Sequence, residues 1–470
     1  MSTEGSREKN LVKNTAILGI GAIISKGLVF FMIPFFSRWL SVDDYGAFDL
    51  YSTYITLLIP FMTLSSGEAI FRFLIDTHED IFEKKNIITN GIVIFFAGSL
   101  VTVSVSLLVL MKTSPLVAIP FCAFLMGEAL NNFTLTYLRG IKKLEKYTIC
   151  NILTMSGIAF FVTLLVLICK TELPGMLYGY ALGYGLSSVF ALVSTSVWKF
   201  IDIKFISFKE IKTLVKYSAP LIPNAISWWI VNASDRTIIK IFLGTAANGI
   251  YAIAYKIPSL CTTLFNVFNI SWQENVSLAI NDEDRETYFA KIFASVIRIL
   301  VSICVCITSI DFILFHYIFD IKYIDGMKYV PILITACIFT VVSQFFGGIF
   351  IGLKEPKYNG GTTVLSAIVN VAVHLALVNI CGLYAAAIST LVSFVFLCVI
   401  RYIIIKRRFT IRFDRSIVIY TGIYCYFIIT HYVDWMPINC VNILIAGVVF
   451  LIANKEYVQK ILKKIGINKK

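Results

Sequence analysis

Charged residues are scarce in this chain of 470 residues, and that scarcity excludes most classes of soluble protein. Asp, Glu, Lys and Arg make up 15% of the sequence, and 58% of it is apolar, whereas soluble domains average about 25% charged and about 45–50% apolar residues. The apolar runs are too long for an outer-membrane barrel, whose strands alternate apolar and polar residues over about 10 positions. The composition therefore predicts an integral membrane protein made of helices.

Motifs for catalysis and metal binding are also lacking. The sequence has no HExxH, GxGxxG, Walker or GxSxG motif, and its 11 cysteines include no CxxC pair. We therefore expect no metal site, no cofactor, no disulfide framework and no enzymatic activity. The polar start is followed by a long apolar stretch without a small-residue cleavage site, so we expect no cleavable signal peptide.

Basic residues outnumber acidic ones, 41 to 28, but their arrangement argues against a nucleic-acid partner. With the N-terminus placed in the cytoplasm, 30 Lys and Arg residues fall in the tails and loops of the cytoplasmic side, and 5 fall on the opposite side. Membrane proteins are oriented by positive charge distributed in this way. The pattern predicts an even number of spans and two cytoplasmic termini.

The apolar runs between the charged breaks predict an all-α membrane protein with 14 transmembrane helices. A helix needs about 20 residues to cross the bilayer, so this number of spans leaves room only for short loops. The expected spans are 14–36, 47–67, 87–111, 116–138, 148–169, 174–198, 217–243, 249–277, 292–315, 330–352, 359–381, 383–405, 416–434 and 437–454.

An internal repeat divides these spans into two lobes. Lys13 and Gly46 correspond to Lys216 and Gly249 at an offset of 203 residues. The offset contains six spans, so the repeat is parallel, with its axis along the membrane normal. This predicts two pseudo-symmetric six-helix lobes with two added C-terminal helices, which is the architecture of an alternating-access transporter. The expected segments are a cytoplasmic tail at 1–13, an N-lobe at 14–198, a cytoplasmic linker at 199–216, a C-lobe at 217–405, the last two helices at 406–454 and a basic cytoplasmic tail at 455–470.

The expected span 217–243 is the most polar of the fourteen. Pro220 and Pro223 permit a bend near its start. We interpret it as a cavity-lining helix with a hinge; alternatively, Asp235 pairs with Arg236 or Lys240 only to hold helices together. The polar residues of this helix gather on one face: Asn224, Ser227, Asn232, Asp235 and Arg236.

Ionisable residues within the spans complete the candidate site. Each costs about 2.5–3.5 kcal/mol at mid-bilayer and therefore needs a partner or a watery cavity. Their cations exceed their anions, which favours a cavity for an anionic group. In the alternative, Lys26 pairs with Glu128 or Glu68, and Lys256 and Arg298 reach the membrane surfaces. The candidate anion-binding residues are Lys26, Arg236, Lys256 and Arg298, and the candidate polar or ion-coupling residues are Glu68, Glu128, Asn224, Asn232 and Asp235.

Three stretches carry a family resemblance. Residues 217–258 contain P-L-I-P-x8-N-x-S-D-R-x-I-I, then F-L-G and G-I-Y-x-I-A-Y-K-I-P. Residues 38–48 read R-W-L-S-x-x-x-Y-G-x-F, and residues 137–140 read Y-L-R-G. These patterns resemble the Wzx-type polysaccharide flippases of the multidrug/oligosaccharidyl-lipid/polysaccharide (MOP) exporter superfamily. Related lipid II flippases carry several Arg residues in the first helix, where this chain has Lys26 and then Arg38.

The resemblance implies a MATE-like flippase in the bacterial cytoplasmic membrane. Such a protein moves an undecaprenyl-pyrophosphate-linked oligosaccharide from the inner to the outer leaflet, for O-antigen, capsule or a related polymer. The implied partners are this lipid-linked substrate, membrane lipids and polysaccharide-assembly proteins, with the flippase itself a monomer. H+ and Na+ are the candidate coupling ions, and the sequence leaves the choice between them open. A drug or cation antiporter of the same superfamily is an alternative, and a membrane glycosyltransferase or polysaccharide polymerase is a second one.

The charge bias makes a direct prediction about topology. Reporter fusions after Lys209 and after Lys470 should both report the cytoplasm, because basic loops are retained on that side. Paired cytoplasmic and extracytoplasmic reporters at each position provide the control. An extracytoplasmic signal at either position would contradict the fourteen-span arrangement.

Overall fold

The computed structural model describes residues 30–77, 80–280, 282–408, 416–433 and 435–455, together with residues 414 and 459. Within these residues the regular secondary structure is helical and no strand occurs, which confirms the predicted all-α class. The chain divides into two compact units, Met1–Arg236 and Thr237–Lys470. Each unit is described separately below.

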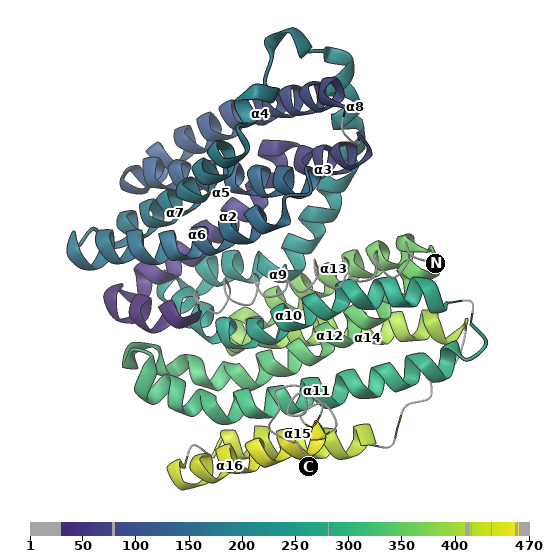
Figure 1. Ribbon diagram of the computed structural model, residues 1–470. Coiled ribbons are helices and arrows are strands. Elements are labelled where there is room, and N and C mark those ends of the chain that lie inside the picture. Colours follow the sequence, from purple (N-terminus) through teal and green to yellow (C-terminus); the bar gives the residue numbers. More distant parts are fainter. Residues whose placement is uncertain are drawn as a thin grey trace. The chain divides into compact units, whose positions relative to one another are not determined.

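The first unit contains long apolar helices and a short amphipathic one. In it, α7 packs against α5 and α6, and α3 and α4 pack against α5 (Figure 1). Its elements are α2 (Val42–Thr63), α3 (Ser66–Asp76), α4 (Ile81–Thr113), α5 (Pro115–Gly140), α6 (Leu144–Val162) with its π-helical extension η1 (Thr163–Ile168), α7 (Glu172–Thr195), the 3-10 turns η2 (Val197–Phe200) and η3 (Ile203–Phe205), α8 (Phe208–Ser218), the turn η4 (Ala219–Leu221) and the greater part of α9 (Ile222–Leu243).

Local sequence explains where several of these helices begin and end. The Ser41 side chain accepts a hydrogen bond from the backbone N–H of Asp44 and so caps α2. The other end of α2 is broken by Pro60 and by Leu64 and Ser65, which have the left-handed φ values 48° and 51°. The axes of α2 and α3 differ by 57° across this break.

Glycines let two helices of the first unit approach closely. Gly175, Gly179 and Gly183 recur every four residues along α7 and so share one side of it. A Cβ atom on Gly179 would lie 2.8 Å from the backbone nitrogen of Val162, and one on Gly183 would lie 2.5 Å from that of Ile158. Small residues at this spacing are typical of contacts between transmembrane helices.

The second unit contains the remaining helices. In it, α12 packs against α10 and α14, α13 packs against α14, and α11 packs against α15 and α16 (Figure 1). Its elements are α10 (Thr245–Ala279), α11 (Arg285–Ile313) with its π-helical extension η5 (Leu314–Ile318), the 3-10 segment η6 (Ile321–Tyr329), α12 (Val330–Gly352), α13 (Pro356–Cys381), α14 (Tyr384–Lys406), α15 (Ser416–His431) and α16 (Met436–Ala453).

A buried arginine ties three of these helices together. Arg401 on α14 is 1% exposed. Its Nη1 donates to the carbonyl oxygen of Ser343 on α12 at 2.6 Å, and its Nε donates to Thr362 Oγ1 on α13 at 3.1 Å. Nη2 donates to Thr363 Oγ1 at 2.9 Å and to the carbonyl oxygen of Asn359 at 3.1 Å. The guanidinium is thus bound by neutral oxygens from two neighbouring helices.

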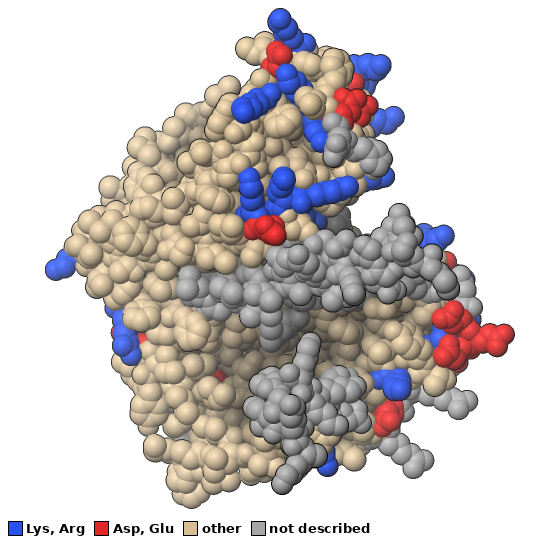
Figure 2. Space-filling view, viewed as in Figure 1, with Lys and Arg blue, Asp and Glu red and all other residues tan. Residues whose placement is uncertain are grey.

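Charged side chains lie mainly at the ends of the helices. In Figure 2 the long sides of both units are largely free of Lys, Arg, Asp and Glu, which gather at helix ends. In the first unit, exposed Lys199, Lys204 and Lys209 come from η2, η3 and α8, which all contact α4. These residues belong to the segment 199–216, which was predicted as a cytoplasmic linker.

Most of the predicted spans have a helix at their position. In the described part of the chain, nine helices are long and apolar enough to cross a membrane, or ten if the bent α2–α3 pair is one span. The more polar α9 and α10 also occupy predicted positions. Most of the expected span 14–36, and the tail 1–13, lie outside the described residues. The total of fourteen and the lobe boundaries therefore stay predictions.

Two glycines of α7 provide a matched test of this packing. Gly183→Ala should lower the free energy of unfolding by about 1–3 kcal/mol, because the new methyl group meets the α6 backbone. Gly185→Ala should be neutral or stabilising by up to about 1 kcal/mol, because no atom lies within 4 Å of its added Cβ. Unfolding of the purified variants in mixed micelles checks both values. Equal effects would show that the α6–α7 contact does not require Gly183.

Candidate functional site

The polar face predicted for α9 makes a buried contact with α2. Arg236 Nε lies 3.4 Å from Asp49 Oδ2, and both side chains are almost fully buried. Trp229 Nε1 donates to the carbonyl oxygen of Thr53 on α2 at 2.8 Å. Asp235, beside Arg236 in the sequence, is 1% exposed. The ion pair and the indole hydrogen bond together fix α9 against α2 within the first unit.

Acidic and aromatic side chains from three helices lie near this ion pair. Glu128 on α5 is close enough to interact electrostatically with Tyr180 and Tyr184 on α7, and Asp49 interacts in the same way with Tyr180. The ring of Tyr180 lies 4.7 Å from that of Phe48. We call this group the acidic–aromatic cluster, and its members are Phe48, Asp49, Phe124, Glu128, Tyr180, Tyr184 and Arg236.

The composition of this cluster defines what it can bind. It has two carboxyl groups, two half-buried phenols and one guanidinium. The carboxylate of Asp49 can bind the guanidinium, a proton or another cation, and Arg236 can bind either Asp49 or an external anion. The cluster therefore suits an exchange of charged partners better than permanent binding of an anion.

The other predicted site residues are spread over both units. Lys26 lies outside the described residues, and so do the side chains of Asn224 and Asn232 on α9. Glu68 is exposed in the first turn of α3, at the α2–α3 bend, where it lines a small pocket of about 120 Å³ with Asn132 and Thr136.

Lys256 and Arg298 belong to the second unit. Lys256 is half-buried on α10, and Arg298 is half-buried on α11. Just before α15, Asp414 Oδ1 accepts a hydrogen bond of 2.6 Å from the backbone N–H of Ser416, which lowers the pKa of that carboxyl, with a smaller contribution from the charge of Arg298. The predicted convergence of Lys26, Arg236, Lys256 and Arg298 on one cavity stays a prediction.

Sequence reasoning missed Asp49, Tyr180 and Tyr184. Asp49 is the third residue of the expected span 47–67, close to the expected start of the helix. The helix begins at Val42, which places Asp49 about two turns inside it. A buried acid inside a helix is a signal for a basic partner, and Arg236 is that partner.

An apolar groove lies among four helices of the second unit. Its volume is about 480 Å³, within the range of small-molecule sites. No charged side chain lines it. The lining residues are Phe293, Ile297 and Val301 of α11; Thr335, Ile338, Phe339, Val342 and Phe346 of α12; Cys398, Val399 and Tyr402 of α14; and Ile417, Thr421, Tyr424, Cys425 and Ile428 of α15.

The fold has counterparts among solved membrane transporters. An inward-facing multidrug resistance MATE family transporter of the MOP superfamily matches with a TM-score of 0.66 and 14% identity, over 83% of this chain and 98% of that one. The lipid II flippase MurJ in an inward closed conformation matches with a TM-score of 0.69 and 15% identity, over 94% of this chain and 99% of that one. The helices and this likeness define the class: a multi-pass membrane protein with the MOP transporter fold.

The sequence itself identifies the family. The model of the polysaccharide biosynthesis protein family matches residues 11–272, and the chain belongs to that family. A short match to an uncharacterized membrane protein of Haemophilus influenzae has 33% identity over 64 residues. It spans 14% of this chain and 16% of that relative, well under two thirds of either.

The Asp49–Arg236 pair can be tested by a double-mutant cycle. Asp49→Asn or Arg236→Gln should each lower the free energy of unfolding by about 3–5 kcal/mol, because one buried charge loses its partner. The double variant should cost clearly less than the sum of the two, since it removes both charges. Unfolding in mixed micelles measures all four proteins.

The half-exposed pair of Arg408 and Glu355, 2.8 Å apart, provides the control for that cycle. Arg408→Gln should cost less than about 1 kcal/mol because solvent replaces the lost contact. Additive effects of Asp49→Asn and Arg236→Gln would contradict the assignment of the buried pair.

Proposed function

We propose that this protein is a flippase that moves a lipid-pyrophosphate-linked oligosaccharide from the inner to the outer leaflet by alternating access, for polysaccharide biosynthesis. Membership of the polysaccharide biosynthesis family supports the pathway. The fold shared with multidrug transporters and a lipid II flippase supports translocation without covalent chemistry. The location is the bacterial cytoplasmic membrane, with both termini in the cytoplasm.

The observation that carries the proposal is the apolar groove of the second unit. One of its walls is α15, which belongs to the last helix pair of the chain. The matched multidrug transporter covers 83% of this chain, whereas the lipid II flippase covers 94%. A groove without charges fits part of a polyprenyl chain, because burial of hydrocarbon is favourable in proportion to its area.

The charged end of the same substrate requires cations. Pyrophosphate cannot cross hydrocarbon unaided, and Lys26, Arg236, Lys256 and Arg298 are the proposed residues that shield it. Arg236 would release Asp49 when it binds phosphate. The freed Asp49 carboxylate could then take up H+ or Na+, which would couple ion binding to substrate binding. Asp235, Asn224, Asn232, Glu68 and Glu128 are the proposed polar positions of that pathway.

A host strain without its own copy of the protein tests this function. Ile338→Trp should fill the groove, so lipid-linked oligosaccharide should accumulate inside and surface polysaccharide should fall at least about tenfold, as for a lost apolar contact of about 1.4 kcal/mol. Ile368→Trp on α13, where the native side chain is 60% exposed, is the matched control and should restore normal polymer. Asp235→Asn and Arg236→Ala should lose more polymer than any fall in their protein level accounts for, because Arg236→Ala also breaks the buried pair with Asp49, so polymer is compared per amount of protein in the membrane.

A drug or cation antiporter is the second candidate function. The carboxyl groups of Asp49 and Glu128 near two phenols favour it, because this arrangement suits a cation. The same strain separates the two functions. An antiporter would change sensitivity to cationic drugs and leave lipid-linked oligosaccharide levels unchanged, and that result would overturn the flippase proposal.

A further inference from the structure

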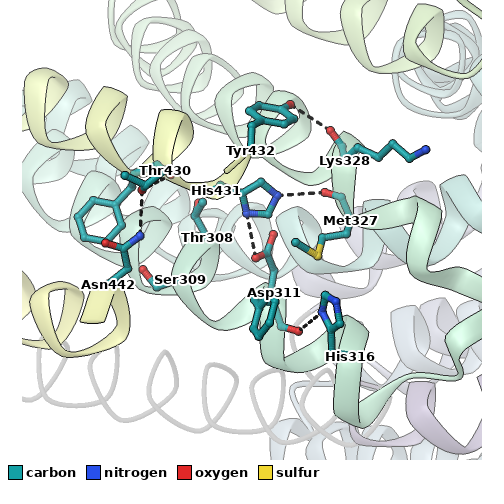
Figure 3. Close-up of polar contacts among 12 residues, drawn as sticks. Thr308, Ser309, Asp311, His316, Met327, Lys328, Thr430, His431, Tyr432 and Asn442 are labelled. Atoms are coloured by element: carbon teal, nitrogen blue, oxygen red, sulfur yellow. Dashed lines mark hydrogen bonds and ion pairs between the residues drawn. The ribbon is translucent and has the colours of Figure 1, made fainter. Parts of the chain in front are cut away.

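A buried acid–histidine pair joins two helices of the second unit. Asp311 Oδ1, in the last turn of α11, lies 3.2 Å from Nδ1 of His431, the final residue of α15. The Asp311 side chain is fully buried and that of His431 is 3% exposed. Figure 3 shows the imidazole between the carboxylate of α11 and the backbone of η6. Neither residue belongs to the sites described above.

The second nitrogen of the ring also faces an oxygen. His431 Nε2 lies 3.4 Å from the carbonyl oxygen of Met327 in η6 (Figure 3). A carboxylate and a carbonyl can only accept hydrogen bonds. Neutral imidazole has one N–H group, whereas imidazolium has two. The two acceptors therefore suit the protonated ring, which can donate to both at once.

The imidazole can be reached from one side. A cavity of about 290 Å³ contacts His431 and is lined also by Ile324, Asp325, Met327, Lys328 and Tyr432. The exposed Asp325 and Lys328 form an ion pair of 2.7 Å at this cavity. Polar groups therefore lead from the surface at η6 to the ring, which is the route a proton requires.

The other ionisable groups around the ring come from five elements. Asp311 on α11 supplies a carboxylate directly opposite the imidazole, and the charges at η6 pair with each other, Lys322 with Asp320 and Lys328 with Asp325. Tyr432, directly after α15, donates to the carbonyl oxygen of Lys328 at 3.0 Å. The further titratable groups of the neighbourhood among the described residues are His316 of η5; Asp320, Lys322, Asp325 and Lys328 at η6; Tyr432 after α15; and Tyr384 of α14.

The same helix forms a wall of the apolar groove. Tyr424 lines the groove, and its hydroxyl lies 3.0 Å from Thr335 Oγ1 on α12. His431 follows Tyr424 by seven residues, or about two turns, and so lies on the same side of α15. Contacts at His431 thus add to the Tyr424–Thr335 hydrogen bond in holding this side of α15.

We infer that Asp311 and His431 form a proton-binding site that fastens α15 to α11 and η6. Proton uptake through the η6 cavity closes the groove wall at its η6 end, and proton loss loosens it. The site itself does not depend on what the protein transports. Its role in holding a lipid chain rests on the proposed function.

Hydrogen–deuterium exchange of the full-length protein in nanodiscs, without substrate, tests the site. A free imidazole has a pKa of about 6.5, so pH 5.5 and pH 7.5 lie on either side of that value. At each pH, the protection of α15 amides against exchange is divided by that of α4 amides. This ratio should fall by about tenfold between pH 5.5 and pH 7.5, as expected for loss of a charge-assisted hydrogen bond. His431→Gln and Asp311→Asn should each abolish this pH dependence.

Two further variants keep the test decisive. Asp311→Asn/His431→Gln retains a neutral hydrogen-bonding pair, so it should fold and show no pH dependence. His316→Gln is the control, because the Nδ1 atom of His316 lies 3.0 Å from the carbonyl oxygen of Phe312 one turn earlier, and it should keep the wild-type profile. A flat wild-type profile, or loss of pH dependence in His316→Gln, would overturn the site. The flippase proposal is tested separately, by the level of lipid-linked oligosaccharide in the host strain, and its failure would leave the proton-binding site unaffected.

Discussion

An ionisable side chain surrounded by hydrocarbon must find its partner on another part of the chain, because neither solvent nor lipid tails can replace it. This constraint accounts for the main polar contacts of both units. Asp49 and Arg236 join α2 to α9, and Asp311 and His431 join α11 to α15. Each pair adds to a neutral hydrogen bond of the same helix, Trp229 to Thr53 for α9 and Tyr424 with Thr335 for α15.

Packing among the apolar helices follows a different rule. Because lipid tails are as apolar as the side chains, burial alone does not drive helices together in a bilayer. Close approach does so instead, as at Gly179 and Gly183, where the backbones of α6 and α7 nearly touch. The apolar groove is the converse case: bulky side chains of α11, α12, α14 and α15 leave space that the chain itself does not fill.

Much of the fold was predictable from the sequence, whereas less of the site was. Long apolar runs and basic loops are features of contiguous sequence. They were therefore sufficient to locate helices such as α5, α12 and α14. The polar face of α9 was visible for the same reason, and it drew attention to Asp235 and Arg236. The partner of Arg236 could not be predicted, because Asp49 is 187 residues away and no local spacing links the two residues. The groove likewise depends on side chains from four helices.

Arg401 has one more consequence for the second unit. Its guanidinium bonds to neutral oxygens of α12 and α13, so no change of protonation in a carboxylate releases it. Helices α12, α13 and α14 should therefore behave as one rigid body at every stage of a transport cycle. Any change of shape within this unit is then left to α10, α11, α15 and α16, and the groove between the rigid body and α11 and α15 changes width with them.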